Sequence, residues 1–369
     1  MNESLREFGR YIDQLIAGRD LTRMESRDLF GQILSGDQTD IHQGAFLSAI
    51  TAKGPTPREI AGAWQAIFEL DTVKVLPETQ KPLVDNCGTG MDAFKTFNIS
   101  TGAAIVASAG GVCVARHGAR AITSGCGTVD LCESLGADVE CAPEIVRQSI
   151  EKTGLGLFNG MSAQVHPRAL FRILSRMRFG SILNIAASLA NPARPLYGVR
   201  GVYAPALVIP VLEAMREIGF VRAMVFHGLL PGKNSGIDEL SPVAESFVAE
   251  LNAEGEISSY RLEPRSLGVE YDEPIEAIAG GGGSQEEALR LLNVFSGKEK
   301  AALYQTICLN AAPLFYVSSA VSDLREGFEK AREVIDSGQA LNQVFNWVQA
   351  QNRNPEQGRI RMNQLLAML

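Results

Sequence analysis

Up to about residue 70, apolar and polar positions alternate with the period of an α-helix. Two segments have the form of helix starts. Residues 22–25 (Thr-Arg-Met-Glu) have the pattern of a capping box, and residues 56–59 (Thr-Pro-Arg-Glu) combine a cap, a proline and a glutamate. Asp40 is expected to cap a further helix, which is expected to end near Gly54. The pattern predicts a small helical bundle. Because it holds no chemical motif, we expect it to be a scaffold or a subunit interface. In the first helix, the apolar positions at helical spacing are Leu5, Tyr11, Ile12, Leu15 and Ile16.

Beyond Leu76 the pattern changes, and short apolar runs alternate with helical segments. Strands separated by helices favour an α/β sheet. The runs expected to form strands are residues 82–84, 112–114, 155–158, 201–203 and 223–227. Residues 170–183 again have a helical pattern and are expected to pack back onto the bundle. A flexible loop is expected at residues 280–283, and further helices are expected from residue 286, over 324–335 and over 341–350.

These patterns predict a two-domain chain, α/β with a small all-helical domain. The helical domain is expected to comprise residues 1–75 together with about 168–193. The α/β domain is expected to comprise residues 76–167 and 194–369.

Composition narrows the classes of function. The chain is 46% hydrophobic and 21% charged, as in ordinary globular proteins, and its net charge of -8 argues against general nucleic-acid or membrane-surface binding. The longest apolar runs, such as residues 103–114, are too short to span a bilayer, and the N-terminus does not have the pattern of a signal peptide. Six cysteines without a Cys-x-x-Cys pair argue against a zinc site. We therefore expect a cytoplasmic protein with no nucleic-acid or membrane partner.

A glycine-rich segment follows the first predicted strand, at residues 85–92 (Asp-Asn-Cys-Gly-Thr-Gly-Met-Asp). Glycines let backbone N–H groups approach an anion, and Asp92 could reach a metal bound to that anion. A tight turn with a surface aspartate is the alternative, and the glycines alone do not decide between the two.

Residues 98–101 (Asn-Ile-Ser-Thr) precede a run of small residues suited to a tightly packed helix. A helix N-terminus offers free N–H donors and the positive end of a dipole, and Ser100 and Thr101 add hydroxyl groups. An ordinary N-cap is the alternative. Two candidate anion sites in strand–loop–helix order favour a functional role.

Residues 116–120 (Arg-His-Gly-Ala-Arg) follow the next strand and precede a loop rich in hydroxyl groups and glycine at residues 123–128. Arg116 can bind phosphate through its planar fork of donors. His117 is a candidate donor, although a single histidine often has a structural role. The adjacent carboxylates of Asp238 and Glu239 suit magnesium, with a solvated acidic loop as the alternative.

Together these segments resemble the anthranilate phosphoribosyltransferase family over nearly the whole chain. The family's Gly-Thr-Gly-Gly-Asp element is Gly-Thr-Gly-Met-Asp at residues 88–92, and Asn-Ile-Ser-Thr is intact at residues 98–101. The Lys-His-Gly-Asn-Arg element becomes Arg-His-Gly-Ala-Arg at residues 116–120, and the acidic pair is intact at residues 238–239. Asn184 and the Asn-Pro pair at residues 191–192 also match.

The resemblance implies phosphoribosyl pyrophosphate as donor, an aromatic amine as acceptor, release of pyrophosphate, two magnesium ions and a homodimer joined through the helical domains. It implies catalysis by positioning and electrostatics, so no catalytic side chain is assigned. The implied donor-binding residues are Gly88, Thr89, Gly90, Asp92, Thr96, Asn98, Ser100, Thr101, Arg116 and Ser124. The implied metal-binding residues are Ser100, Asp238 and Glu239.

The sequence departs from the family at the acceptor site, whose implied positions are His117, Ala119, Arg178 and Gly180. Ala119 replaces the family's asparagine, Gly180 falls on its carboxylate-binding arginine, and Ala187-Ser188 replaces Gly-Pro. A buried carboxylate without its cation is costly, so anthranilate binding should weaken unless Arg176 or Arg178 substitutes. A different aromatic or heterocyclic amine is therefore an open alternative to anthranilate.

Two other classes of function are less well supported. A related nucleoside phosphorylase would carry Lys-His-Ser-Thr-Gly-Gly, which residues 85–90 do not match. A non-catalytic binding protein on the same scaffold, for example for nucleic acid, conflicts with the acidic charge and with the retained acidic pair.

Overall fold

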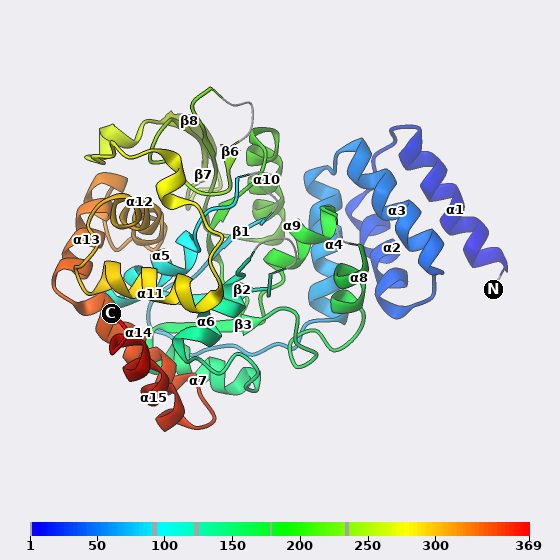
Figure 1. Ribbon diagram of the computed structural model, residues 1–369. Coiled ribbons are helices and arrows are strands. Elements are labelled where there is room, and N and C mark those ends of the chain that lie inside the picture. Colours follow the sequence, from blue (N-terminus) through cyan, green and yellow to red (C-terminus); the bar gives the residue numbers. More distant parts are fainter. Residues whose placement is uncertain (1, 91–93, 122–124, 178, 233–235) are drawn as a thin grey trace.

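The structure is a computed structural model that describes residues 2–90, 94–121, 125–177, 179–232 and 236–369. A helical bundle lies at one end of the molecule and a larger α/β body at the other (Figure 1). This arrangement confirms the predicted fold class. The bundle contains α1 (Asn2–Ile16), α2 (Arg23–Ser35), α3 (Asp40–Lys53), α4 (Pro57–Leu70), α8 (Leu170–Met177) and α9 (Ile182–Leu189).

The helix starts in the bundle follow its capping residues. Thr22 and Thr56 each accept a backbone N–H and complete the predicted capping boxes of α2 and α4. The third helix corrects the prediction by one position, because the Thr39 hydroxyl accepts the N–H of His42 and Asp40 is the first helical residue. Because Asp40 lies in the first turn, its negative charge interacts favourably with the positive end of the helix dipole.

The segment expected as one helix over residues 170–183 forms two helices. Ser181 and Asn184 make a capping box that starts α9, so the chain turns between α8 and α9. Both helices share one apolar core with α2, α3 and α4, and this core continues onto α10 (Val208–Ile218) and one face of the sheet.

The sheet has the order β3-β2-β1-β4-β5-β7-β8, and β6 pairs with β5. Its strands are β1 (Leu83–Gly88), β2 (Cys113–Gly118), β3 (Leu155–Asn159), β4 (Tyr197–Gly201), β5 (Arg222–Leu229), β6 (Gly236–Ile237), β7 (Ser246–Leu251) and β8 (Ile257–Leu262). The strands from β3 to β5 are parallel, and β6, β7 and β8 are antiparallel additions that the sequence patterns did not predict. β4 lies earlier than the predicted strand at residues 201–203.

Helices cover both faces of the sheet (Figure 1). The remaining helices of the α/β body are α5 (Ile99–Ala109), α6 (Thr128–Leu135), α7 (Pro143–Thr153), α11 (Ser284–Phe295), α12 (Ala302–Val317), α13 (Leu324–Asp336), α14 (Gln339–Ala350) and α15 (Pro355–Leu366). The largest core packs α5, α11, α12, α13 and α14 against the sheet. Short 3-10 turns lie at residues 205–207, 264–267 and 275–278. Among the described helices, we find none with the length and apolar character to cross a membrane.

The strand order places a crevice beside β1 and β4. From β1 the chain proceeds through α5 to β2 on one side, whereas β4 and β5 continue on the other. Ligands of open α/β sheets bind at such a point, outside the carboxyl ends of the strands. Gly88 and Gly201 end these two strands and are paired in register.

Candidate active site

A cavity of about 270 Å³ lies at the carboxyl ends of β1 and β2. One part is lined by the glycine loop after β1, the start of α5 and the acidic pair at residues 238–239. The other part is lined by β2 and the segment after it, residues 160–161, and helices α8 and α9. The cavity therefore lies where the helical bundle meets the sheet.

Arg116 forms hydrogen bonds to two walls of the first part of the cavity. Arg116 lies on β2, and it is only 3% exposed, beside β1 and the start of α5. Its Nε donates to Asn86 Oδ1 at 2.9 Å, its Nη2 donates to Ser100 Oγ at 3.1 Å, and its Nη1 donates to the Thr101 hydroxyl. The Asn86 amide in turn donates to the Ser100 carbonyl at 2.8 Å. A fixed positive charge thus lies directly behind the helix start.

The acidic pair lies against the backbone donors of the same cavity. Gly90 N donates to Asp238 Oδ2 at 2.7 Å, and Ser100 N donates to Glu239 Oε1 at 3.1 Å. The approach requires glycine, since a Cβ on Gly88 would lie 2.3 Å from the Asp238 carboxylate and one on Gly201 1.5 Å from the Asp238 carbonyl oxygen. Burial raises the pKa of Asp238 above its usual range.

The acidic loop is held in place by a side chain of α12. The side chain of Asn310, on α12, accepts from Leu240 N at 2.8 Å and donates to the Leu240 carbonyl at 3.2 Å. This pair of bonds fixes the residue next to Glu239.

The donor set of the cavity suits magnesium. Asp238, Glu239 and the Ser100 hydroxyl provide oxygen ligands, which magnesium prefers. Within the described ranges, no group of three or more His, Cys, Asp or Glu side chains is placed to hold a metal. A magnesium ion that completes its shell with water and phosphate oxygens fits this set, whereas a closed all-protein zinc site does not.

The second part of the cavity contains a buried pair of histidines. His117, the last residue but one of β2, and His166 are 5% and 1% exposed, and their Nε2 atoms are 3.0 Å apart. His166 Nδ1 lies 2.6 Å from the Asp71 carbonyl and donates to it, so the Nε2 of the neutral His166 accepts from His117 Nε2. Burial lowers the pKa of His117 well below its usual value and also lowers the pKa of His166.

The cysteines of the cavity are poor nucleophiles. Burial raises the pKa of Cys87 to about 11 and that of Cys126 to about 12. A thiol attacks as its thiolate, so both groups are inert at neutral pH. This protonation state agrees with chemistry that needs no covalent intermediate.

Comparison with known proteins identifies the family. Residues 10–70 match the model of the glycosyl transferase family helical bundle domain, and residues 80–341 match the model of the glycosyl transferase family a/b domain. Anthranilate phosphoribosyltransferase of Methanosarcina barkeri is 40% identical over 90% of this chain and 87% of its own length. That of Myxococcus xanthus is 36% identical over 90% of this chain and 96% of its own length. The chain belongs to the anthranilate phosphoribosyltransferase family.

Solved structures of anthranilate phosphoribosyltransferases have the same fold. The enzyme from Thermus thermophilus superposes with a TM-score of 0.82 at 33% identity, over 92% of this chain and 98% of its own. The enzyme from Saccharomyces cerevisiae in complex with PRPP and Mg superposes with a TM-score of 0.79 over 94% of this chain and 98% of its own. At 24% identity, this second likeness establishes the fold.

Within this family fold, most of the predicted donor-site residues lie together. Gly88, Thr89, Gly90, Thr96, Asn98, Ser100 and Arg116 line the cavity, as do Asp238 and Glu239. Thr101 does not line it, and its buried hydroxyl supports Arg116 from behind. Asp92 and Ser124 lie outside the described residues.

The predicted acceptor-site residues are less uniformly placed. His117, Ala119, Ala187 and Ser188 line the second part of the cavity. Gly180 is half-buried between α8 and α9 but is not among the lining residues, and Arg178 lies outside the described residues. Arg176 is 65% exposed and pairs with Asp40 on α3.

Several residues at the site had no role in the sequence-based prediction. Asn86 is hydrogen-bonded to Arg116, and His166 is hydrogen-bonded to His117. Lys95 donates to the Gly90 carbonyl at 3.2 Å. Arg120 also lines the cavity. Asn86 and Lys95 stand within or just after the glycine-rich segment, so a polar residue there was an available signal. His166 lies 49 residues from its partner and had no local signal.

Proposed function

We propose that this chain transfers the 5-phosphoribosyl group of phosphoribosyl pyrophosphate to an aromatic amine, anthranilate or a related acceptor, with release of pyrophosphate. One observation carries the proposal: the glycine loop, the helix start with Arg116 and the acidic pair converge on one cavity at the sheet's switch point. The names of the relatives and the yeast complex with PRPP and Mg support it.

In the proposed reaction, the amine nitrogen bonds to the anomeric carbon as the bond from that carbon to the diphosphate oxygen breaks. The amine proton leaves to solvent, and the electron pair of the broken bond stays on pyrophosphate. Positive charge develops on the sugar and negative charge on the leaving group. Arg116, the hydroxyl of Ser100 and the N–H groups of the glycine loop and helix start stabilise the negative charge. Alignment of the two reactants in the cavity supplies much of the remaining acceleration.

Magnesium is the proposed cofactor, as two ions. When bound, it neutralises charge on the diphosphate. Asp238, Glu239 and Ser100 would hold it. With the carboxylates on the metal, Gly90 N and Ser100 N, which donate to them in this structure, would be available to phosphate oxygens. Gly88, Thr89, Thr96, Asn98 and Thr101 complete the proposed donor site, together with Asp92 and Ser124 beyond the described residues.

Calorimetry with phosphoribosyl pyrophosphate tests the donor site. We expect binding that requires magnesium, followed by pyrophosphate release when an aromatic amine is added. Absence of binding at saturating magnesium would contradict the proposal.

The acidic pair gives a sharper test. Asp238→Ala with Glu239→Ala should lower turnover about 100-fold or more, because the metal ligands are lost, while the free energy of unfolding changes little. Asp272→Ala with Glu273→Ala is the matched control, since this exposed Asp-Glu pair lies outside the active-site cavity. Equal turnover in both double variants would contradict the proposal that Asp238 and Glu239 bind the metal.

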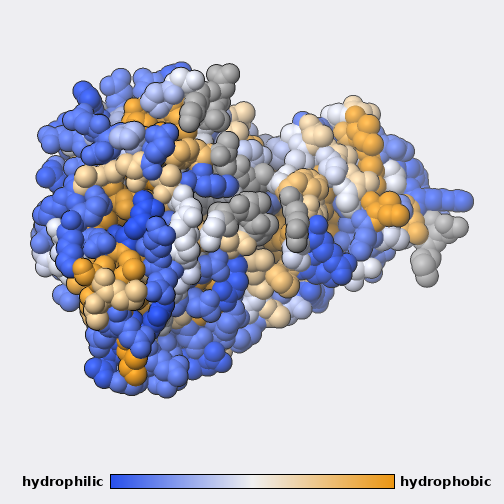
Figure 2. Space-filling view, in the orientation of Figure 1, coloured by the Kyte–Doolittle hydropathy of each residue, from blue (hydrophilic) through white to orange (hydrophobic). Residues whose placement is uncertain are grey.

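We also propose a cytoplasmic homodimer, with the helical domain of residues 1–75 and about 168–193 at the interface. The bundle carries apolar surface (Figure 2), and Ile16, Met24 and Ile41 are 72%, 68% and 84% exposed. Light scattering should give twice the chain mass of 39.7 kDa, and Ile41→Asp should weaken the dimer. A monomer at all concentrations would argue against it.

A further inference from the structure

We infer that the acceptor selected by this chain is an aromatic or heteroaromatic amine without a carboxylate. The inference rests on the proposed transfer and concerns the second part of the cavity, which is lined by β2, the segment after it, α8 and α9. Three features of this part carry it: the pairing of Arg120, the bonding of the two histidines, and the apolar character of the remaining wall.

Arg120 is the described cation that lines this part of the cavity, and acidic side chains surround it. Its Nη1 lies 2.7 Å from Glu133 and 3.1 Å from Asp130, and its Nη2 lies 3.1 Å from Glu140. One positive and three negative charges sum to a local charge of -2. A carboxylate on the acceptor would therefore meet net repulsion, even though the partly exposed position of these groups screens it.

The histidines offer no replacement for a free cation. His166 Nδ1 donates to the Asp71 carbonyl, so its Nε2 accepts the hydrogen bond from His117 Nε2. A neutral His117 has a single N–H, which this bond uses, so its Nδ1 is an acceptor and offers no donor to a ligand carboxylate. The positions of these rings therefore give His117 a structural part in the cavity wall.

The other cations of the described cavity lining face the donor. Arg116 donates to Asn86, Ser100 and Thr101, and Lys95 donates to the glycine loop. Both lie where the diphosphate and its magnesium are proposed to bind. Neither is placed on the wall formed by α8 and α9.

The remainder of the acceptor wall is small and apolar. Its side chains are Ala119, Ala121, Met161, Leu170, Leu174 and Ala187. The nearby Asn184 side chain accepts from Ser181 N at 3.0 Å as part of the α9 cap. Such a wall accommodates a flat ring through apolar contact, with the amine directed to the donor.

Matched amine pairs test the inference. For 2-, 3- and 4-aminobenzoate and the corresponding aminobenzamides, only the charge of one substituent changes. We expect kcat/KM from pyrophosphate release to favour the best benzamide over its benzoate by at least tenfold. Equal values or a preference for the benzoate would overturn the inference.

A second measurement separates this inference from the proposed transfer. Binding of the same pairs to the enzyme saturated with magnesium pyrophosphate is measured by calorimetry. If no amine is turned over although the donor binds, the proposed transfer fails, while the binding ratio still decides charge selectivity. A ratio near one, or binding by no benzamide, would overturn the inference.

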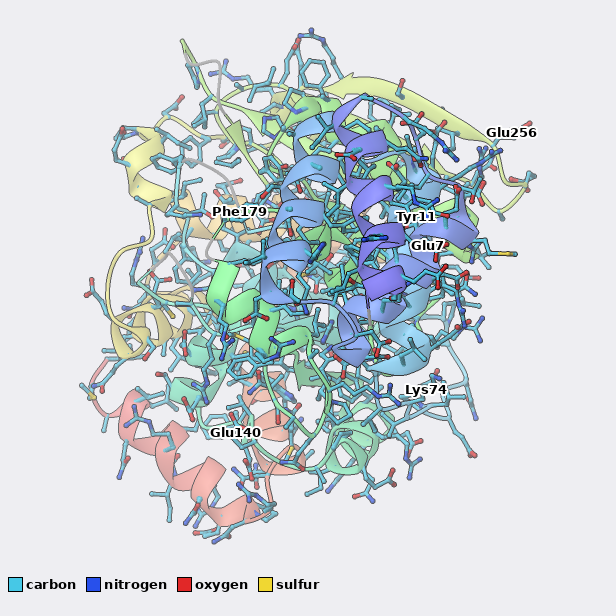
Figure 3. All side chains as sticks on the ribbon, turned by 90° about the vertical axis from the view of Figure 1, so that its right-hand side faces the viewer. Glu7, Tyr11, Lys74, Glu140, Phe179 and Glu256 are labelled. Carbon is cyan, nitrogen blue, oxygen red and sulfur yellow. The ribbon has the colours of Figure 1, made fainter. Side chains whose placement is uncertain are left out.

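A double variant tests the part of Arg120. Glu133→Gln with Glu140→Gln keeps the shape of the Arg120 partners and removes two negative charges. We expect the benzamide-to-benzoate ratio to fall at least fivefold. Glu140 lies on the side of the molecule that carries the bundle (Figure 3).

Glu329→Gln with Glu333→Gln is the matched control. These residues make surface ion pairs on α13 and give the same change in net charge. The control should retain the wild-type ratio. An unchanged ratio in the Glu133 and Glu140 variant, with an unchanged melting temperature, would show that Arg120 pairing does not set selectivity.

Discussion

Arg116 combines a structural and a proposed binding role in one side chain. It is buried, and its guanidinium donates to Asn86, Ser100 and Thr101. Arg116→Met removes the charge and leaves these acceptors unpaired. We expect the free energy of unfolding to fall by about 1–3 kcal/mol. We expect the affinity for phosphoribosyl pyrophosphate with magnesium to fall about 100-fold. Urea denaturation and calorimetry measure the two effects.

Arg116→Lys is the informative control for this prediction. Lysine keeps the charge but has no planar fork, so it cannot reach all three acceptors at once. We expect donor affinity between that of wild type and that of Arg116→Met. Wild-type affinity in the methionine variant would show that Arg116 is a structural residue.

Arg200 and Asp85 form a buried ion pair beneath the site, with side chains 1% and 0% exposed. Arg200 also donates to the Ser188 carbonyl at 3.0 Å, at the end of α9. Arg200→Met leaves the Asp85 charge buried without its cation. The free energy of unfolding should fall by about 3–5 kcal/mol, as measured by urea denaturation. The double variant Arg200→Met with Asp85→Leu should recover much of this loss, and two additive losses would contradict a coupled pair.

The residues of the site differ in how far the sequence could predict them. The glycine loop follows β1, Ser100 lies at the start of α5 and Arg116 lies near the carboxyl end of β2, so parallel strands bring them to one edge of the sheet. Asp85 and Arg200 are 115 residues apart, and neither has a neighbour in sequence that indicates its partner. Such pairings depend on strand order, which a local pattern does not contain.

At the scale of elements, Asp71 organises the start of α8. Its carboxylate accepts from Ala169 N at 3.0 Å and from Leu170 N at 2.8 Å, and also from Arg168 N. Asp71→Ala leaves three buried or half-buried donors unpaired, and we expect the free energy of unfolding to fall by about 2 kcal/mol. Because α8 lines the acceptor part of the cavity, the KM for the amine should also rise. A change in stability without a change in this KM would separate the helix start from acceptor binding.

Helix boundaries were predicted better than strands because capping residues are local signals. The threonines at 22 and 56 started helices where predicted. The hairpin of β7 and β8 was missed because its strands lack a regular alternation. β7 has a mixed burial pattern, and four consecutive residues of β8 are exposed.

At the scale of the whole molecule, the sequence patterns predicted an α/β body with a helical bundle but not the order of the strands. The position of β4 next to β1 creates the crevice, and it follows from crossovers that no single segment encodes. The Thermus thermophilus structure has the same fold.

Stability of the whole molecule should depend on pH through the buried histidines. Burial lowers the pKa of His117 and of His166 in the folded state, whereas the unfolded chain has ordinary histidine values near 6.5. As the pH falls below about 6.5, the unfolded chain binds protons that the folded chain does not bind, so the free energy of unfolding decreases. Each such histidine contributes a slope of up to about 1.4 kcal/mol per pH unit.

Comparison of wild type with His166→Gln isolates this effect. Carboxyl groups whose pKa burial raises, such as Asp238, contribute with the opposite sign, but they cancel in the difference between the two proteins. Urea denaturation between pH 8 and 5.5 should give free energies of unfolding for wild type and variant that converge as the pH falls. The slope of this free energy against pH should be smaller in the variant, by the contribution of about one proton. Because the ring of His166 also holds His117 at the cavity wall, the variant should lose acceptor affinity at pH 8, where both rings are neutral. Parallel stability curves with unchanged acceptor affinity would show that the histidine pair neither titrates as inferred nor shapes the cavity.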